Sequence, residues 1–350
     1  MKYLVTGGAG FIGSHITDTL VEQGHDVVVL DDLSSGHKAN LSEVWNKIEF
    51  IEGDICDAAT CLKAAEGCDG IFHEAALVSV PDSINRPRDN HDINITGTLN
   101  ILEAARQQGV KRVVFASSAA VYGDNPELPK REDMLPEPKS PYALAKLTGE
   151  YYLKVYAECF GLETVALRYF NVFGPRQDPS SMYSGVISIF SERIKKGLPI
   201  TIYGDGEQTR DFVNVADVVS ANLLAMTTVK IVQNVKAVKR ESDLNESCKD
   251  GSTNSTFNEG SARFNEPRSG VSTSGSAAFN VFNVASGKAT SLLSLLDDLE
   301  SIVGQTVERK FMPSRAGDIK HSGADISKVR KTLGYKSQTV LKEGLAQLLV

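Results

Sequence analysis

The chain has 350 residues, 41% of them hydrophobic, which is enough for two ordinary globular domains or one large one. Its 37 basic and 44 acidic residues give a net charge of −7, and no basic stripe is long enough to follow a phosphate backbone, so we expect no nucleic acid partner. No apolar run approaches the ~18 residues of a membrane span, and no secretory signal is evident, so we expect no membrane association. The five cysteines form no Cys-x-x-Cys pair, which indicates reduced thiols, no metal site and a cytoplasmic protein.

Short apolar runs alternate with helix-length segments through the first half of the chain. Strands are predicted at residues 3–5, 26–30, 49–52, 70–73, 112–117 and 163–167, and helices at 12–23, 95–108 and 141–160. This order predicts an α/β fold with a Rossmann-like, doubly wound parallel sheet.

The second half of the chain is more irregular. We predict a cofactor domain over residues 1–168 and, mainly, a smaller C-terminal substrate-binding lobe over 169–350, which includes a strand at 279–284 and a helix at 290–302. Residues 229–276 are rich in Ser, Asn, Thr, Gly and charged side chains, which predicts a disordered surface insertion.

Glycines recur every three residues where the first strand turns into the first helix, in Thr6-Gly7-Gly8-Ala9-Gly10-Phe11-Ile12-Gly13. Gly7 permits the tight turn, Gly10 lets the backbone approach a pyrophosphate, and Gly13 lets helix and strand touch. The pattern predicts a dinucleotide site at Gly7, Gly10, Phe11, Ile12 and Gly13.

A carboxylate follows the second strand about twenty residues further on, in Asp31-Asp32, where it accepts hydrogen bonds from the adenosine ribose hydroxyls. A carboxylate repels a 2′-phosphate, and no arginine stands beside Asp31. The predicted cofactor is therefore NAD, not NADP.

A phenol and an ammonium one helical turn apart are predicted by Tyr142-Ala143-Leu144-Ala145-Lys146, and Ser118 ends the preceding strand. The lysine charge favours the phenolate, so we expect Lys146 to lower the pKa of Tyr142. The three side chains predict a base that takes a hydroxyl proton.

With these motifs the sequence resembles the extended short-chain dehydrogenase/reductases, and within them the nucleotide-sugar 4-epimerases. The resemblance spans nearly the whole chain except the insertion. It rests on the glycine turn and the Ser118, Tyr142 and Lys146 set, together with Gly53-Asp54, His73-Glu74-Ala75-Ala76, Leu167-Arg168-Tyr169-Phe170-Asn171-Val172-Phe173-Gly174-Pro175, Arg210-Asp211-Phe212 and Arg315-Ala316-Gly317-Asp318.

The resemblance implies further cofactor contacts: the adenine at Asp54 and Ile55, the middle of NAD at Ala75 and Ala76, a polar anchor at Asn94, and the nicotinamide side at Phe170, with Lys146 on its ribose. It implies a UDP site formed by Asn171, Arg210, Arg315 and Asp318, with Tyr203 near the uracil; two arginines suit a diphosphate. It also implies a homodimer through helices at about 92–108 and 142–160.

The reaction implied is inversion of carbon 4 of a UDP-sugar through a transient 4-keto sugar. Ala119-Ala120 stand where dehydratases and decarboxylases of the family carry a carboxylate, which disfavours those reactions. Ser322 replaces a bulky tyrosine of hexose-restricted epimerases, and the segment with Gln177 resembles epimerases of N-acetylated sugars. UDP-N-acetylglucosamine and UDP-N-acetylgalactosamine are favoured. UDP-glucose and UDP-galactose, a UDP-glucuronate epimerase or decarboxylase, and a non-catalytic scaffold stay open as alternatives.

Overall fold

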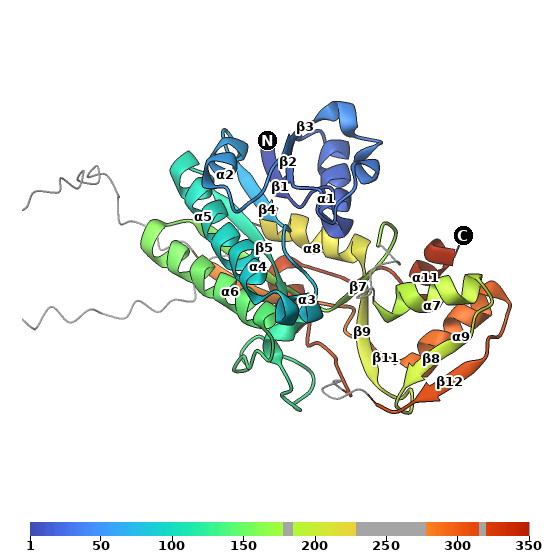
Figure 1. Ribbon diagram of the computed structural model, residues 1–350. Coiled ribbons are helices and arrows are strands. Elements are labelled where there is room, and N and C mark those ends of the chain that lie inside the picture. The colour runs from blue at the N-terminus through green and yellow to red at the C-terminus, as the bar shows by residue number, and fades with distance from the viewer. Residues whose placement is uncertain (178–184, 229–277, 315–319, 350) are drawn as a thin grey trace, which may run out of the picture.

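The computed structural model describes residues 1–177, 185–228, 278–314 and 320–349 (Figure 1). The predicted insertion at 229–276 lies outside the described residues. No helix of the described parts is both long and apolar enough to cross a membrane.

Strands and helices alternate along the first half, as predicted. The strands are β1 (Lys2–Thr6), β2 (Asp26–Asp31), β3 (Ile48–Glu52), β4 (Gly70–His73), β5 (Arg112–Ser118), β6 (Glu163–Tyr169), β7 (Asn171–Phe173), β8 (Ile200–Tyr203), β9 (Thr209–Asn214), β10 (Phe279–Val284), β11 (Ala289–Ser291) and β12 (Arg309–Met312). The α-helices are α1 (Phe11–Glu22), α2 (Ala58–Ala64), α3 (Val80–Asn85), α4 (Pro87–His91), α5 (Gly97–Gln108), α6 (Pro141–Phe160), α7 (Val186–Lys195), α8 (Val215–Thr227), α9 (Leu292–Val303), α10 (Ser327–Leu333) and α11 (Leu341–Leu349).

The central sheet has seven strands in the order β10-β6-β5-β4-β1-β2-β3, and every neighbouring pair is parallel. Chain order reverses between β1 and β4, because the chain winds outward from β1 in one direction and from β4 in the other. The crevice outside the carboxyl ends of these two strands is where doubly wound sheets bind ligands. The predicted fold class is confirmed.

Helices cover both faces of this sheet (Figure 1). On one face α2, α5 and α6 bury apolar side chains such as Ile101 and Leu153. On the other, α1 and α8 bury Ile16, Leu20 and Val218. Strands buried on both faces read as continuous apolar runs, which is why β1 and β2 were recognisable from sequence.

A second, smaller core is formed by α7, α9 and α11 with β8 at the right of Figure 1, where β12 pairs with β8. Its buried side chains include Phe190, Ile202 and Leu299. The chain passes between the two cores repeatedly: β10 joins the central sheet and α8 covers it, although both follow residue 168. Residue 168 itself lies inside β6, so the predicted boundary does not coincide with an element end.

Two of the predicted helix starts differ from the structure by two residues or more. The helix predicted at 290–302 begins only at Leu292, because Ala289–Ser291 pairs with β9 and the Ser291 hydroxyl caps the helix by accepting from Ser294 N at 3.1 Å. The helix predicted at 95–108 begins as a π-helical turn, Asp92–Thr96, before α5. Its predicted end is confirmed, since Gly109 adopts φ +69° at the helix C-terminus.

Candidate active site

The glycine turn lies between β1 and α1 and touches the segment after β4. Gly7 has φ +66°, and a Cβ there would come within 2.7 Å of Ala75 N. A Cβ on Gly13 would overlap the carbonyl oxygen of Gly7. Side chains are therefore excluded at Gly7 and Gly13, in the turn that a pyrophosphate would approach.

Helix α1 begins at Phe11 with Gly10 as its N-cap, and no side chain caps it. The first N–H groups of a helix have no partner within the helix, and its dipole favours an anion there. Phe11 and Ile12 lie in this first turn, and Ile12 also packs against the α1–α8 core. The glycine cradle and the uncapped helix start fit a dinucleotide.

Asp31 ends β2 and is only 6% exposed. Its carboxylate accepts from Ala9 N at 2.9 Å and from Leu33 N at 2.8 Å, which fastens the glycine turn to β2. Burial raises the pKa of Asp31, while these two backbone donors oppose the rise. Each oxygen keeps a free lone pair for a ribose hydroxyl. Asp32 is exposed and accepts from the backbone and hydroxyl of Ser34 at 2.9 and 2.7 Å.

The segment after β3 turns toward α5. Asp54 accepts from Cys56 N at 2.8 Å, which tightens this turn. Ile55 is buried, and the side chain packs so closely that a Cβ on Gly97 would come within 2.6 Å of it. Asp54 and Ile55 thus lie at the carboxyl edge of the sheet, next to the start of α5.

A chain of hydrogen bonds ties β1, β4 and α5 together. Thr98 Oγ1 donates its proton to Asn94 O at 2.8 Å and lies 3.0 Å from His73 Nε2. The hydroxyl therefore accepts from the histidine, so Nε2 is the protonated ring nitrogen. His73 Nδ1 then accepts from Thr6 Oγ1 at 2.7 Å, and Thr6 Oγ1 accepts from Ala75 N at 3.2 Å. Burial lowers the pKa of His73 to about 3, which agrees with a neutral ring.

Asn94 anchors the segment after Ala75 and Ala76. Its side chain accepts from Leu77 N at 2.8 Å, and donates to Leu77 O at 2.9 Å and to Asn90 Oδ1 at 2.8 Å. The π-helical turn around Asn94 interrupts the regular helix at this point, as such turns often do at functional sites. The side chain is 2% exposed, so the structure shows an anchor of the protein backbone here.

Ser118, Tyr142 and Lys146 gather at the carboxyl end of β5. Ser140 caps α6 by accepting from Ala143 N at 3.2 Å, and Pro141 occupies the first helical position. Lys146 Nζ lies 5.8 Å from the centre of the Tyr142 ring and 5.0 Å from that of Phe115 on β5. The helix thus delivers both side chains to the end of the strand that carries Ser118.

Tyr142 and Lys146 are perturbed by burial. Desolvation lowers the pKa of Lys146 to about 8, while the charge of Glu74 opposes the fall. The pKa of Tyr142 is raised by desolvation and by Glu74, against a lowering contribution from the Ser118 hydroxyl. The expected lowering of the Tyr142 pKa is therefore not found in the protein alone, since desolvation and the Glu74 carboxylate outweigh the Ser118 hydroxyl.

A buried ion pair fixes the position of α6 against the strands next to Ser118. Glu150, one helical turn beyond Lys146, accepts from Arg168 at 2.9 and 2.7 Å and from Ser117 Oγ at 2.5 Å. Arg168 also lies over the Tyr122 ring at 4.8 Å. Glu150 therefore links α6 directly to β5 and β6, beside Ser118.

The predicted substrate residues lie on the smaller lobe and its junction. Phe170 is buried in the core of the cofactor domain, while Asn171, one residue later, is exposed on β7. Gln177 donates to Val172 O at 3.3 Å and accepts from Ser188 Oγ at 2.7 Å, so both its polar ends are bound within the protein.

Arg210 and Ser322 come together along β9. Arg210 donates to Thr209 O at 2.8 Å, and Ser322 N donates to the same oxygen at 3.0 Å. Ser322 lines a small hollow of about 200 Å³ together with Asp211. Tyr203 ends β8, which pairs with β12. Arg315 and Asp318 lie outside the described residues.

Sequence reasoning assigned no role to Glu74, Tyr169 or Asn222, which form a largely buried hydrogen-bonded row at the same sheet edge. Tyr169 donates to Glu74 at 2.8 Å, and Asn222 donates to Tyr169 at 2.7 Å. A carboxylate directly after a buried parallel strand was a signal for Glu74. Asn222 gave none, because it lies within an apolar helix.

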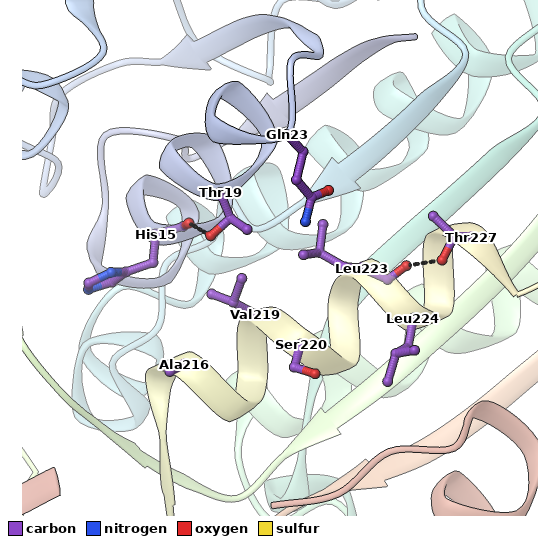
Figure 2. A pocket seen from close by; sticks show the side chains of 9 residues that line it. All are labelled: His15, Thr19, Gln23, Ala216, Val219, Ser220, Leu223, Leu224 and Thr227. Carbon is purple, nitrogen blue, oxygen red and sulfur yellow. Dashed lines mark hydrogen bonds between the residues drawn. The ribbon is translucent and has the colours of Figure 1, made fainter. Parts of the chain in front are cut away.

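Another hollow of the described parts lies elsewhere, between α1 and α8 (Figure 2). It measures about 440 Å³ and is lined by residues of α1 and α8 such as Thr19 and Leu223; Figure 2 also shows Gln23, just after α1, pointing toward Leu223. No predicted site residue lines it. It is therefore separate from the Ser118, Tyr142 and Lys146 set.

Comparison with known proteins agrees with this geometry. Residues 3–238 match the model of the NAD dependent epimerase/dehydratase family. The chain is 38% identical over 351 residues to the UDP-glucose 4-epimerase of Mycolicibacterium smegmatis, covering 99% of this chain and 97% of that protein.

Two solved structures are also similar over nearly the whole chain. The UDP-glucose 4-epimerase of Thermotoga maritima with UDP-glucose has a TM-score of 0.82 and 36% identity, covering 100% of this chain and 97% of that one. The UDP-N-acetylglucosamine 4-epimerase of Methanobrevibacter ruminantium, in complex with UDP-N-acetylmuramic acid, has the same score and identity, covering 99% and 96%. With a family match over more than half of its length and these relatives, the chain belongs to the NAD-dependent epimerase/dehydratase family.

Proposed function

We propose that the protein is an NAD-dependent UDP-sugar 4-epimerase that interconverts UDP-N-acetylglucosamine and UDP-N-acetylgalactosamine. The observation that carries the proposal is the meeting of Ser118, Tyr142 and Lys146 at the sheet edge that also holds the glycine turn. A hydroxyl, a phenol and an ammonium at a dinucleotide site suit the removal of a proton from a sugar alcohol.

The chain's own residues divide the work as follows. Gly7, Gly10 and Gly13 admit the pyrophosphate, and Asp31 accepts from the adenosine ribose. Bound NAD supplies the hydride acceptor and, when oxidised, a positive charge. That charge favours the Tyr142 phenolate, which burial and Glu74 oppose in the protein alone.

Tyr142 then accepts the proton of the 4-hydroxyl, with the Ser118 hydroxyl held beside it, and returns it to the oxygen of the 4-ketone after the ketone has turned. The hydride taken from carbon 4 is given back to the opposite face of that carbon. Lys146 keeps a positive charge near the phenolate at neutral pH, because its lowered pKa is still about 8. Ala119 and Ala120, which follow Ser118 in a short 3₁₀ turn, carry no acid that could eliminate water.

One feature supports the acetylated sugars. Ser322 is a small side chain beside a hollow on β9, where a tyrosine would fill space. Relatives with the same TM-score and identity include a UDP-glucose and a UDP-N-acetylglucosamine 4-epimerase, so family similarity alone favours neither sugar.

The test is a coupled assay on purified protein with the two acetylated UDP-sugars, UDP-glucose and UDP-galactose, alongside release and measurement of bound NAD. We expect tightly bound NAD and the fastest turnover with an acetylated substrate. Turnover confined to the plain hexoses would refute the choice of sugar. A cofactor-free protein that is inert on all four would refute the enzyme and favour the scaffold alternative.

We also propose a homodimer through α5 and α6. Leu144, Tyr151 and Val155 are 53%, 57% and 46% exposed, and their spacing of seven and four residues puts them on one face of α6. Exposed apolar stripes of this kind mark interaction sites. A second copy of the same helix face would cover this stripe by two-fold symmetry.

A further inference from the structure

Glu74, Tyr169 and Asn222 form a hydrogen-bonded row in which Tyr169 and Asn222 are buried and Glu74 is partly buried, and the proposed chemistry assigns the row no step. The donors and acceptors determine the direction of each hydrogen bond in the row. Asn222 Nδ2 donates to Val218 O at 3.0 Å and to Tyr169 Oη at 2.7 Å. Because the Tyr169 hydroxyl accepts from Asn222, its own proton points to Glu74, 2.8 Å away. The carboxylate oxygen is thereby held in one place.

This place lies next to the reacting residues. Ser118 and Tyr169 are direct partners in the β5–β6 register. His73 is the partner of Phe115 in the β4–β5 register, and Glu74 is the next residue after His73. Since Lys146 Nζ lies 5.0 Å from the Phe115 ring, the carboxylate and the ammonium approach the same strand end.

They approach it from opposite faces of the sheet. Tyr169 packs in the α1–α8 core and bonds to α8, whereas Phe115, under Lys146, packs in the α5–α6 core. Glu74 and Lys146 therefore meet across the carboxyl edge, in the crevice that the family uses for its cofactor.

We propose that Glu74, oriented by Tyr169 and Asn222, is a positioning residue that controls the charge of the Tyr142–Lys146 pair. The inference rests on the proposed function in taking Tyr142 as the base. A carboxylate at this edge stabilises the Lys146 ammonium and opposes the Tyr142 phenolate.

The charge of Glu74 itself is adjustable near neutral pH. Desolvation raises the pKa of Glu74 to about 7, while the Tyr169 hydroxyl and the Lys146 charge oppose the rise. The groups that face it are Tyr169 from β6, Lys146 and Tyr142 from α6, and neutral His73 from β4; α8 contributes only the uncharged Asn222. A group that ionises near pH 7 in contact with none of the reacting atoms suits a regulator of pH dependence.

The sign of the effect follows from the two contributions. Glu74→Gln removes a negative charge that raises the pKa of both Tyr142 and Lys146. Tyr142 then loses its proton at lower pH, which moves the acidic limb of the pH profile of kcat/KM to lower pH. Lys146 also loses its proton at lower pH, which moves the alkaline limb in the same direction.

Tyr169→Phe gives an independent result. It removes a donor to the carboxylate, so the pKa of Glu74 rises and the residue stays neutral over a wider range. The acidic limb should move to lower pH as in Glu74→Gln. The alkaline limb should move to lower pH by less than in Glu74→Gln, because Glu74 is still partly ionised there.

The matched control is Glu103→Gln. Glu103 also accepts a tyrosine hydroxyl, from Tyr156 at 2.5 Å, and it also carries one negative charge. Tyr156 follows Tyr142 by fourteen residues along α6, about 21 Å. This variant should keep both limbs of the parent profile.

A second readout does not depend on turnover. Tyrosinate absorbance is titrated in the NAD-loaded parent and in Glu74→Gln, each against the same protein with Tyr142→Phe, so that the difference reports Tyr142 alone. The midpoint should be lower in Glu74→Gln. A shifted midpoint without activity on any UDP-sugar would refute the proposed function and support this inference. Active Glu74→Gln protein with unshifted limbs and midpoint, or a loss of activity equal at every pH, would overturn it.

Discussion

The buried pair between Glu150 and Arg168 allows a quantitative test of how the active-site helix is held. Both side chains are 4% exposed, two hydrogen bonds join them, and Ser117 adds a third bond to the carboxylate. Glu150→Leu keeps a comparable volume but leaves the Arg168 charge buried. Arg168 Nη1 already has no partner among the described residues, so little compensation is available.

Removal of one partner of a buried pair costs about 3–5 kcal/mol, against a typical stability of about 5–15 kcal/mol for the whole fold. We expect the Glu150→Leu variant to lose about that much free energy of unfolding. Glu150→Leu combined with Arg168→Met should recover most of the loss, because no uncompensated charge remains and well-packed apolar replacements are often neutral.

The assay is urea unfolding followed by circular dichroism, with the parent, both single variants and the double variant. Glu192→Leu serves as the control, since Glu192 and Lys196 form an exposed pair at 2.7 Å whose loss should cost no more than about 1 kcal/mol. If Glu150→Leu costs as little as Glu192→Leu, or if the double variant is no more stable than the single ones, the reasoning is wrong.

Four further results are expected. Tyr142→Phe should lower kcat in the coupled epimerase assay by about 10²–10⁴-fold while NAD stays bound, and parent-like turnover would refute Tyr142 as the base. Gly13→Ala places a Cβ against the carbonyl of Gly7, so the purified variant should contain less NAD by absorbance and melt at lower temperature; an unchanged NAD content would contradict the cradle. Ser322→Tyr should suppress turnover of acetylated UDP-sugars and spare plain ones, whereas equal losses on both would refute the gate. Tyr151→Glu should yield a monomer by light scattering, and an intact dimer would exclude this face of α6 as the interface.

The local parts of the fold were predictable because local rules determine them. Helix α6 begins and ends where predicted: Ser140 caps its start, Pro141 occupies its first position, and Gly161 adopts φ +72° at its end. The strands at 70–73 and 279–284 were also exact, because each is a short segment rich in β-branched and aromatic residues.

Features of the fold and of the site that depend on contacts between distant segments were not predictable from one sequence. The membership of β10 in the central sheet is decided by pairing with β6, more than a hundred residues earlier. The row from Glu74 to Asn222 joins side chains 95 and 53 residues apart. The direction of the Tyr142 pKa was missed for the same reason, since neither its burial nor the approach of Glu74 follows from the spacing of Tyr142 and Lys146.

The short connections between the two cores have a consequence for how a keto sugar would rotate within the site. One residue separates β6 from β7, none separates β9 from α8, and β10 is followed by β11 within four residues. A lobe attached through several short connecting segments cannot rotate about a single hinge, because all of these segments would have to change conformation together. In an epimerase built this way we expect the keto sugar to rotate while the distance between the two cores stays nearly constant. The ligand then moves and the protein stays rigid.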